Sequence, residues 1–74
     1  MQTIKLNNKE LFKIVYYSIL IINSIDNNSY IFINDYIINL LKLIKDPNNT
    51  LLNLEYKELK KECIKIVNTI IYDQ

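Results

Sequence analysis

Three apolar segments, separated by short asparagine-rich patches, are the feature that most constrains what this chain can fold into. The patches lie at Asn7–Asn8, Asp26–Ser29 and Asp46–Thr50. Within the segments, apolar residues recur every three or four positions, which is the period of an amphipathic α-helix. The chain has 74 residues, the length of one small domain. We therefore predict a single helical domain over residues 1–74.

The spacing predicts three helices, roughly 8–25, 30–45 and 53–72, packed as a small antiparallel three-helix bundle in an all-α fold. Asn7, Ser29 and Asn53 are the candidate N-caps, because their side chains can accept hydrogen bonds from the free N–H groups of a first turn. Pro47 is expected either to stop the second helix or to open the third at its first position.

One apolar stripe on each expected helix forms the candidate core. The stripes consist of Leu11, Ile14, Val15, Ile21, Ile22 and Ile25, then Tyr30, Ile33, Ile37, Leu40, Leu41 and Ile44, and finally Leu52, Tyr56, Leu59, Cys63, Ile66, Val67 and Ile70. The rest of the third segment is mostly polar, so its helix is expected to have one face in solvent.

An α+β fold with a β-hairpin around residues 19–33 is the alternative. Two β-prone runs, 19–25 and 30–33, flank the turn-like patch Asp26–Ser29. However, the chain is rich in residues with AT-rich codons and lacks Gly, Ala and Arg, which indicates a very AT-rich coding sequence. Such coding raises the isoleucine content whatever the fold, so we favour the helices.

The composition argues against catalysis. There is no histidine, the commonest general base and metal ligand, and no glycine to build a phosphate-binding loop. Cys63 is the single cysteine, so an internal disulfide is excluded, and its place on an apolar stripe predicts a buried, inert thiol. We expect no enzymatic activity, no metal and no cofactor.

The charged residues are typical of a solvated surface. Glu58 with Glu62, or Asp35 with Asp46, could form an acid pair, but the two glutamates lie among lysines. A basic stripe with tyrosines nearby is the candidate nucleic-acid surface: Lys57, Lys61 and Lys65, with Tyr56 and Tyr72. The net charge is only +1, and arginine is absent. We therefore do not expect nucleic-acid binding, although a small nucleic-acid-binding regulator is kept as an alternative.

The run of residues 14–22 is apolar apart from Ser18, and three lysines precede it, as in a signal peptide. No small-residue cleavage site follows, and no run reaches the roughly 18 apolar residues of a membrane-spanning helix. We expect no membrane association. The expected location is the cytoplasm, or the host cytoplasm if a phage encodes the protein, with Cys63 reduced.

The first segment carries more apolar surface than one core can use. Tyr16 and Tyr17 are adjacent, so they cannot both face the same core, and Leu20 lies one turn further on. Tyrosine is enriched at protein interfaces. We predict a partner-binding surface formed by Tyr16, Tyr17 and Leu20, extended by Ile31, Phe32 and Ile38. The alternative is that this helix is central and is covered by its own chain.

These observations predict a small, non-catalytic protein–protein interaction module that inhibits or regulates a larger protein. A structural homo-oligomer, such as a homodimer, is the alternative. In its size, AT-rich coding and lack of catalytic residues, the chain resembles small proteins of phages and mobile elements. Many of those proteins inhibit host defence, and anti-CRISPR proteins are among them. The resemblance has no motif, so it transfers no functional residue.

Overall fold

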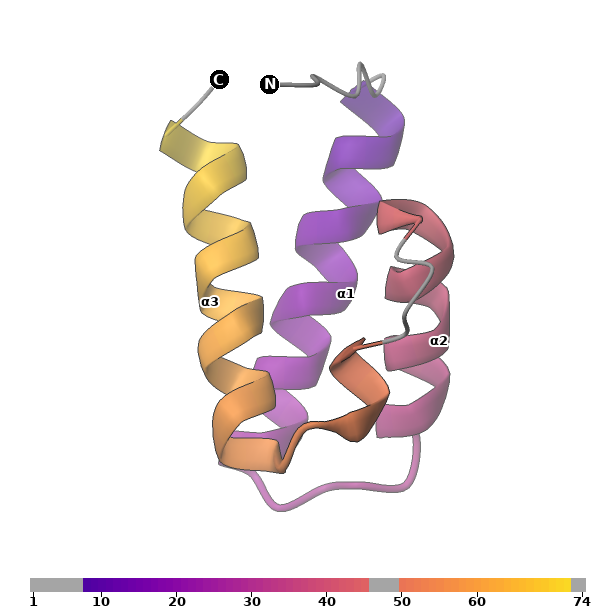
Figure 1. The fold of residues 1–74 in the computed structure, drawn as a ribbon, viewed down its shortest axis with the longest axis vertical. Helices are drawn as coiled ribbons and strands as arrows, with labels where there is room; N and C mark the ends of the chain where they lie inside the picture. The colour runs from indigo at the N-terminus through magenta and orange to yellow at the C-terminus, as the bar shows by residue number, and fades with distance from the viewer. Residues whose placement is uncertain (1–7, 46–49, 73–74) are drawn as a thin grey trace.

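A computed structural model describes residues 8–45 and 50–72, and three α-helices lie side by side in it (Figure 1). The helices are α1 (Asn8–Asp26), α2 (Ile33–Ile44) and α3 (Tyr56–Tyr72), and a short 3-10 helix, η1 (Thr50–Asn53), precedes α3. The described residues contain no strand, so the all-α three-helix bundle is confirmed. The alternative hairpin is wrong, because residues 19–26 continue α1.

Helix α1 is the central element of the bundle. Both α2 and α3 run antiparallel to α1 and pack closely against it, whereas the backbones of α2 and α3 lie farther from each other (Figure 1). The short η1 packs against α2. All four elements contribute to one buried cluster, which consists of Ile14, Ile21, Ile33, Ile37, Leu40, Leu41, Leu51, Leu59 and Cys63.

Helix α1 ends in a Schellman motif. Asn28 has a left-handed backbone with a φ angle of 54°. The N–H of Ser29 donates to the carbonyl of Ser24 at 2.8 Å, and the N–H of Asn28 donates to the carbonyl of Ile25 at 3.2 Å. This is the hydrogen-bond pattern in which a left-handed residue closes a helix. The expectation that Ser29 caps the second helix is therefore wrong, since this residue completes the end of the first.

Helix α2 begins at Ile33, later than the expected residue 30. Phe32 occupies the N-cap position and makes no side-chain capping hydrogen bond. Asp35 in the first turn places negative charge near the positive end of the helix. The helix ends at Ile44, and Lys45 then adopts the left-handed conformation, with a φ angle of 55°.

Helix α3 begins at Tyr56, not at residue 53. The carbonyl of Glu55 accepts the first helical hydrogen bond, from the N–H of Leu59 at 2.8 Å. Asn53, an expected cap, ends η1 instead. Within η1, Leu51 is buried and Leu52 is 46% exposed, so the expected place of Leu52 in the core is wrong. The other two predicted helix signals, Asn7 and Pro47, lie outside the described residues.

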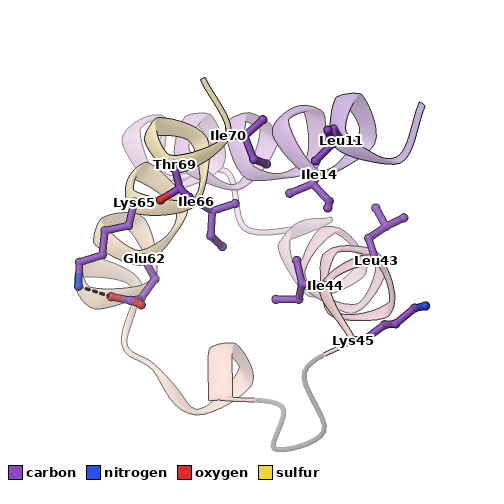
Figure 2. Close-up of a pocket in the computed structure, with 10 residues that line it drawn as sticks. All are labelled: Leu11, Ile14, Leu43, Ile44, Lys45, Glu62, Lys65, Ile66, Thr69 and Ile70. Atoms are coloured by element: carbon purple, nitrogen blue, oxygen red, sulfur yellow. Dashed lines mark ion pairs between the residues drawn. The ribbon is translucent and has the colours of Figure 1, made fainter. Parts of the chain in front are cut away.

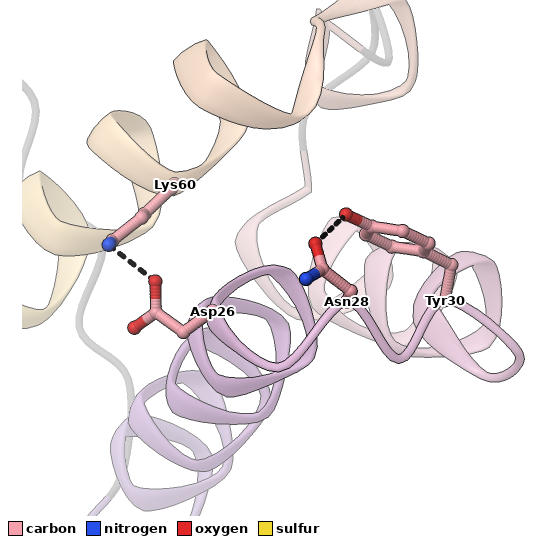
Figure 3. A network of polar contacts seen from close by, with 4 residues as sticks. All are labelled: Asp26, Asn28, Tyr30 and Lys60. Atoms are coloured by element: carbon pink, nitrogen blue, oxygen red, sulfur yellow. Dashed lines mark hydrogen bonds and ion pairs between the residues drawn. The ribbon is translucent and has the colours of Figure 1, made fainter.

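Polar and aromatic contacts connect the end of α1 and the loop that follows it to the start of α3, and Figure 3 shows the polar ones. Lys60 of α3 forms an ion pair with Asp26, the last residue of α1. The ring of Tyr30 stacks on that of Tyr56, with centroids 4.5 Å apart. The Tyr30 hydroxyl also donates to Oδ1 of Asn28 at 2.8 Å. Tyr30 therefore lies in the loop between α1 and α2, and it connects that loop to α3.

None of the described helices is both long enough and apolar enough to cross a membrane.

Candidate interaction surface

A continuous row of aromatic rings crosses α1 and α2. The Phe12 ring stacks against Tyr16 with centroids 6.4 Å apart, and Tyr16 meets Tyr17 edge to face at 5.4 Å. Tyr17 then contacts Tyr36 of α2 at 6.4 Å, and Tyr36 contacts Phe32 at 6.5 Å. We call these five residues the aromatic row. All four separations lie within the range of favourable aromatic pairs.

Helical spacing explains how the aromatic row forms. Phe12 and Tyr16 are four residues apart, so they share the outward face of α1. Tyr17 is turned by about 100° from Tyr16 around the helix axis, toward α2, where it packs against the core. The predicted divergence of the two adjacent tyrosines is therefore confirmed: Tyr16 is 50% exposed and Tyr17 is half-buried.

The aromatic row borders a hollow of about 380 Å³ between α1 and α2. We call it the aromatic hollow, and it is lined by Tyr16, Tyr17, Leu20, Phe32, Asp35, Tyr36 and Asn39. The Asn39 side chain is held in place, because its Nδ2 donates to the backbone carbonyl of Asp35 at 2.9 Å. The hollow therefore combines aromatic walls with one carboxylate and one amide.

Four of the six predicted contact residues meet at this hollow: Tyr16, Tyr17, Leu20 and Phe32. Ile31 is 83% exposed and does not line it. Ile38 is 43% exposed and borders a separate hollow with Leu41, Lys42 and Leu52. Ile38 therefore does not extend the surface formed by the other residues.

Sequence reasoning missed four residues of this surface: Phe12, Asp35, Tyr36 and Asn39. Phe12 is the most exposed member of the aromatic row, at 71%. The sequence did contain a pattern that places Phe12 on this surface, because Phe12 lies one helical turn before Tyr16. Tyr36 could have been found in the same way, since it lies one helical turn after Phe32. Nothing in the sequence indicates that Asp35 and Asn39 face α1, because that depends on how α2 is rotated about its axis.

A second hollow, of about 320 Å³, lies among the three helices (Figure 2). We call it the apolar hollow, and it is lined by Leu11, Ile14, Leu43, Ile44, Lys45, Glu62, Lys65, Ile66, Thr69 and Ile70. Ile44 and Ile66 point into this space, whereas Lys45 points away from it (Figure 2). Its lining residues come from all three helices and from Lys45, which follows α2.

The charged groups of α3 form ion pairs on its surface. Lys61 lies 3.6 Å from a carboxylate oxygen of Glu58, and Lys65 lies 3.0 Å from one of Glu62. This agrees with the interpretation of the basic stripe and the acid pair as a salt-bridged surface. Asp46, a member of the other suggested acid pair, lies outside the described residues.

Cys63 is fully buried, as predicted. Burial, with a further contribution from the charge of Glu62, raises the pKa of the Cys63 thiol to about 12. The thiol is therefore protonated at neutral pH, whereas a nucleophile or metal ligand requires the thiolate. Among residues 8–45 and 50–72, no group of three His, Cys, Asp or Glu side chains is placed to hold a metal ion.

Comparison with protein-family models, with curated proteins and with solved structures finds no match to this chain.

Proposed function

We propose that this protein is a small, non-catalytic interaction module that binds a larger protein through the aromatic row and the aromatic hollow. The observation that supports the proposal is the exposure of Phe12, Tyr16 and Phe32, at 71%, 50% and 57%, in one connected row of rings. Scattered exposed apolar residues are normal on a protein surface, but a contiguous aromatic patch is typical of a binding site.

The effect on the partner follows from binding alone. The acids of α3 are paired with lysines, and the single thiol is buried, so these groups offer no reactive centre. A binder of this kind acts by covering a functional surface of its partner or by stabilising one of its conformations. We therefore retain inhibition or regulation as the proposed activity, including the anti-defence role suggested by the resemblance to proteins of phages and mobile elements.

The test is a comparison of two double variants that carry the same added charge. Phe12→Lys with Tyr16→Lys places two cations on the aromatic row, and both side chains are exposed, so the core is not altered. Ile71→Lys with Tyr72→Lys is the matched control on α3, where the exposures are 57% and 81%. Tyr17 is left unchanged because it packs against the core.

Tagged wild type and both variants would be recovered from native host cells, and the bound proteins would be measured by quantitative mass spectrometry. We expect at least one protein to be captured by the wild type and the α3 control and lost, about tenfold or more, with the Phe12→Lys, Tyr16→Lys variant, because aromatic contacts at the centre of an interface carry much of its binding energy. Equal capture by both variants would refute the proposed surface.

Light scattering on the purified protein separates a heterologous partner from a second copy of the chain. We expect the mass of one chain, 8.9 kDa, at micromolar concentration. Twice that mass for the wild type, reduced to one chain by the aromatic-row substitutions alone, would replace the proposal with the structural homo-oligomer.

A further inference from the structure

We propose that the aromatic hollow receives an arginine side chain of the partner protein. The inference deepens the proposed function, on which it rests for the identity of the partner as a protein. Its basis is the combination of aromatic rings with the Asp35 carboxylate in the lining of the hollow, because both favour a cation that donates hydrogen bonds.

The walls of the hollow are aromatic. Three inclined ring pairs form them: Tyr16 with Tyr17 at 69°, Tyr17 with Tyr36 at 39°, and Phe32 with Tyr36 at 42°. These rings do not lie in one flat stack, so their faces point in several directions. The face of an aromatic ring carries negative electrostatic potential, which attracts an ammonium or guanidinium group.

The two polar side chains of the hollow are suited to accept hydrogen bonds. The Asp35 carboxylate has only acceptors. Asn39 uses one N–H of its Nδ2 group as a donor to the Asp35 carbonyl, and its Oδ1 is a further acceptor. The ion pairs found among the described residues use Asp26, Glu58 and Glu62, and Asp35 is in none of them.

Of the cationic side chains, arginine fits these groups best. Its planar guanidinium stacks on aromatic rings and donates in several directions at once, whereas a lysine ammonium is compact and strongly hydrated. The chain contains no arginine, so neither this molecule nor a second copy can supply the guest. Lys9 and Lys13, the described lysines of α1, do not line the hollow.

The test uses N-acetyl-arginine amide as the probe and N-acetyl-citrulline amide as its neutral isostere, each titrated into isotope-labelled protein and followed by NMR. We expect saturable shifts at Tyr17, Tyr36 and the Asn39 side-chain amide, with a millimolar dissociation constant for arginine, because a single side chain makes few contacts. Citrulline is expected to bind roughly fivefold more weakly or worse, since it has lost the charge that attracts the rings and the carboxylate.

Two variants locate the effect at Asp35. Asp35→Asn keeps the shape of an exposed side chain, and we expect it to weaken arginine binding roughly fivefold while leaving citrulline binding unchanged. Glu55→Gln is the matched control, because it removes one exposed negative charge beside the start of α3 and outside the hollow. Circular dichroism of both variants checks that the helices are intact.

Three results would overturn the inference: equal binding of arginine and citrulline, no effect of Asp35→Asn, or shifts confined to the apolar hollow. The outcome is separable from that of the proposed function. If the probe fails but the aromatic-row variant still loses its captured protein, the interaction stands without an arginine. If the probe binds but capture is unaffected, the hollow binds arginine and the proposed function fails.

Discussion

Ser18 is the single residue whose chemistry most conflicts with its surroundings. Its side chain is completely buried in α1, and its hydroxyl has no hydrogen-bond partner among the described residues. A buried hydroxyl without a partner costs on the order of 1–3 kcal/mol, because it has lost its hydrogen bonds to water. Ser18 therefore lowers the stability of a domain whose small size already limits its core.

We expect Ser18→Ala to raise the free energy of unfolding by about 1–2 kcal/mol, through removal of the hydroxyl and the higher helix propensity of alanine. Urea denaturation measures the change. Ser24→Ala in the same helix is the control, because Ser24 is half-buried and reports mainly the propensity gain of about 0.5 kcal/mol. A gain at Ser18 no larger than that at Ser24 would mean that the buried hydroxyl carries no penalty.

Individual core positions were predictable where they repeat at helical spacing. Cys63 follows Leu59 by four residues, and both are buried as predicted. Ser18 lies four residues after Ile14 and three before Ile21, so the helical spacing predicts its burial. It was not assigned to the core because serine is polar. The predicted core positions of Tyr30, Leu52 and Tyr56 are wrong, because all three are exposed. Tyr30 and Leu52 precede the helices whose stripes they were assigned to, and Tyr56 is the first residue of α3.

Among the elements, η1 contributes more to the core than its length suggests. Leu51, in this 3-10 helix, is 5% exposed, whereas the next residue, Leu52, is 46% exposed. The element packs against α2, which it helps to cover where α3 does not reach. One leucine of the pair is therefore a core residue and the other lies on the surface.

We expect Leu51→Ala to lower the free energy of unfolding by about 2–4 kcal/mol, since it removes buried methyl groups and leaves a cavity. Leu52→Ala is the neighbouring control, and we expect a loss below about 1 kcal/mol because its side chain is half exposed. Thermal or urea unfolding measures both. A larger loss of stability for Leu52→Ala than for Leu51→Ala would mean that Leu52 is the buried residue, and it would contradict the position of η1.

The existence of the three helices was predictable, but their starting points were not. Apolar periodicity is a property of the whole segment, so it predicts a helix even where single isoleucines favour a strand. A helix start depends on which local hydrogen bonds form, and Ser29 donates its backbone N–H to the end of α1. Likewise, η1 takes the residues that a periodic pattern assigns to the beginning of α3.

At the scale of the whole molecule, the three helices leave an open apolar hollow on the surface of the bundle. The apolar hollow measures about 320 Å³, and six of its lining side chains are leucine or isoleucine. Side chains beside unfilled space lack the contacts that a close-packed core provides. The molecule can therefore gain stability by filling this space without any change in fold.

We expect Ile44→Phe, which points a larger side chain into the apolar hollow, to raise the free energy of unfolding by about 0.5–2 kcal/mol. Ile71→Phe on α3 is the control, because Ile71 is 57% exposed and gains no buried contacts. Chemical denaturation of both variants measures the difference. A loss of stability in Ile44→Phe alone would show that the hollow has no room for the ring.

The candidate surface was only partly predictable. The excess of apolar residues on α1 predicted a surface at Tyr16, Tyr17 and Leu20, and these three residues line one hollow. The alternative, that α1 is the central helix, also describes the molecule, because α1 packs against both other helices while Phe12 and Tyr16 stay exposed. What the sequence could not supply was the rotation of α2, which brings Phe32 to the hollow and takes Ile38 away from it.

The central position of α1 also affects how such a sequence can evolve, because both α2 and α3 pack against it. Ile14 of α1 borders residues of both other helices at the apolar hollow. A substitution on the core face of α1 must therefore stay compatible with two neighbouring helices at once. Selection for folding acts on α1 from two sides.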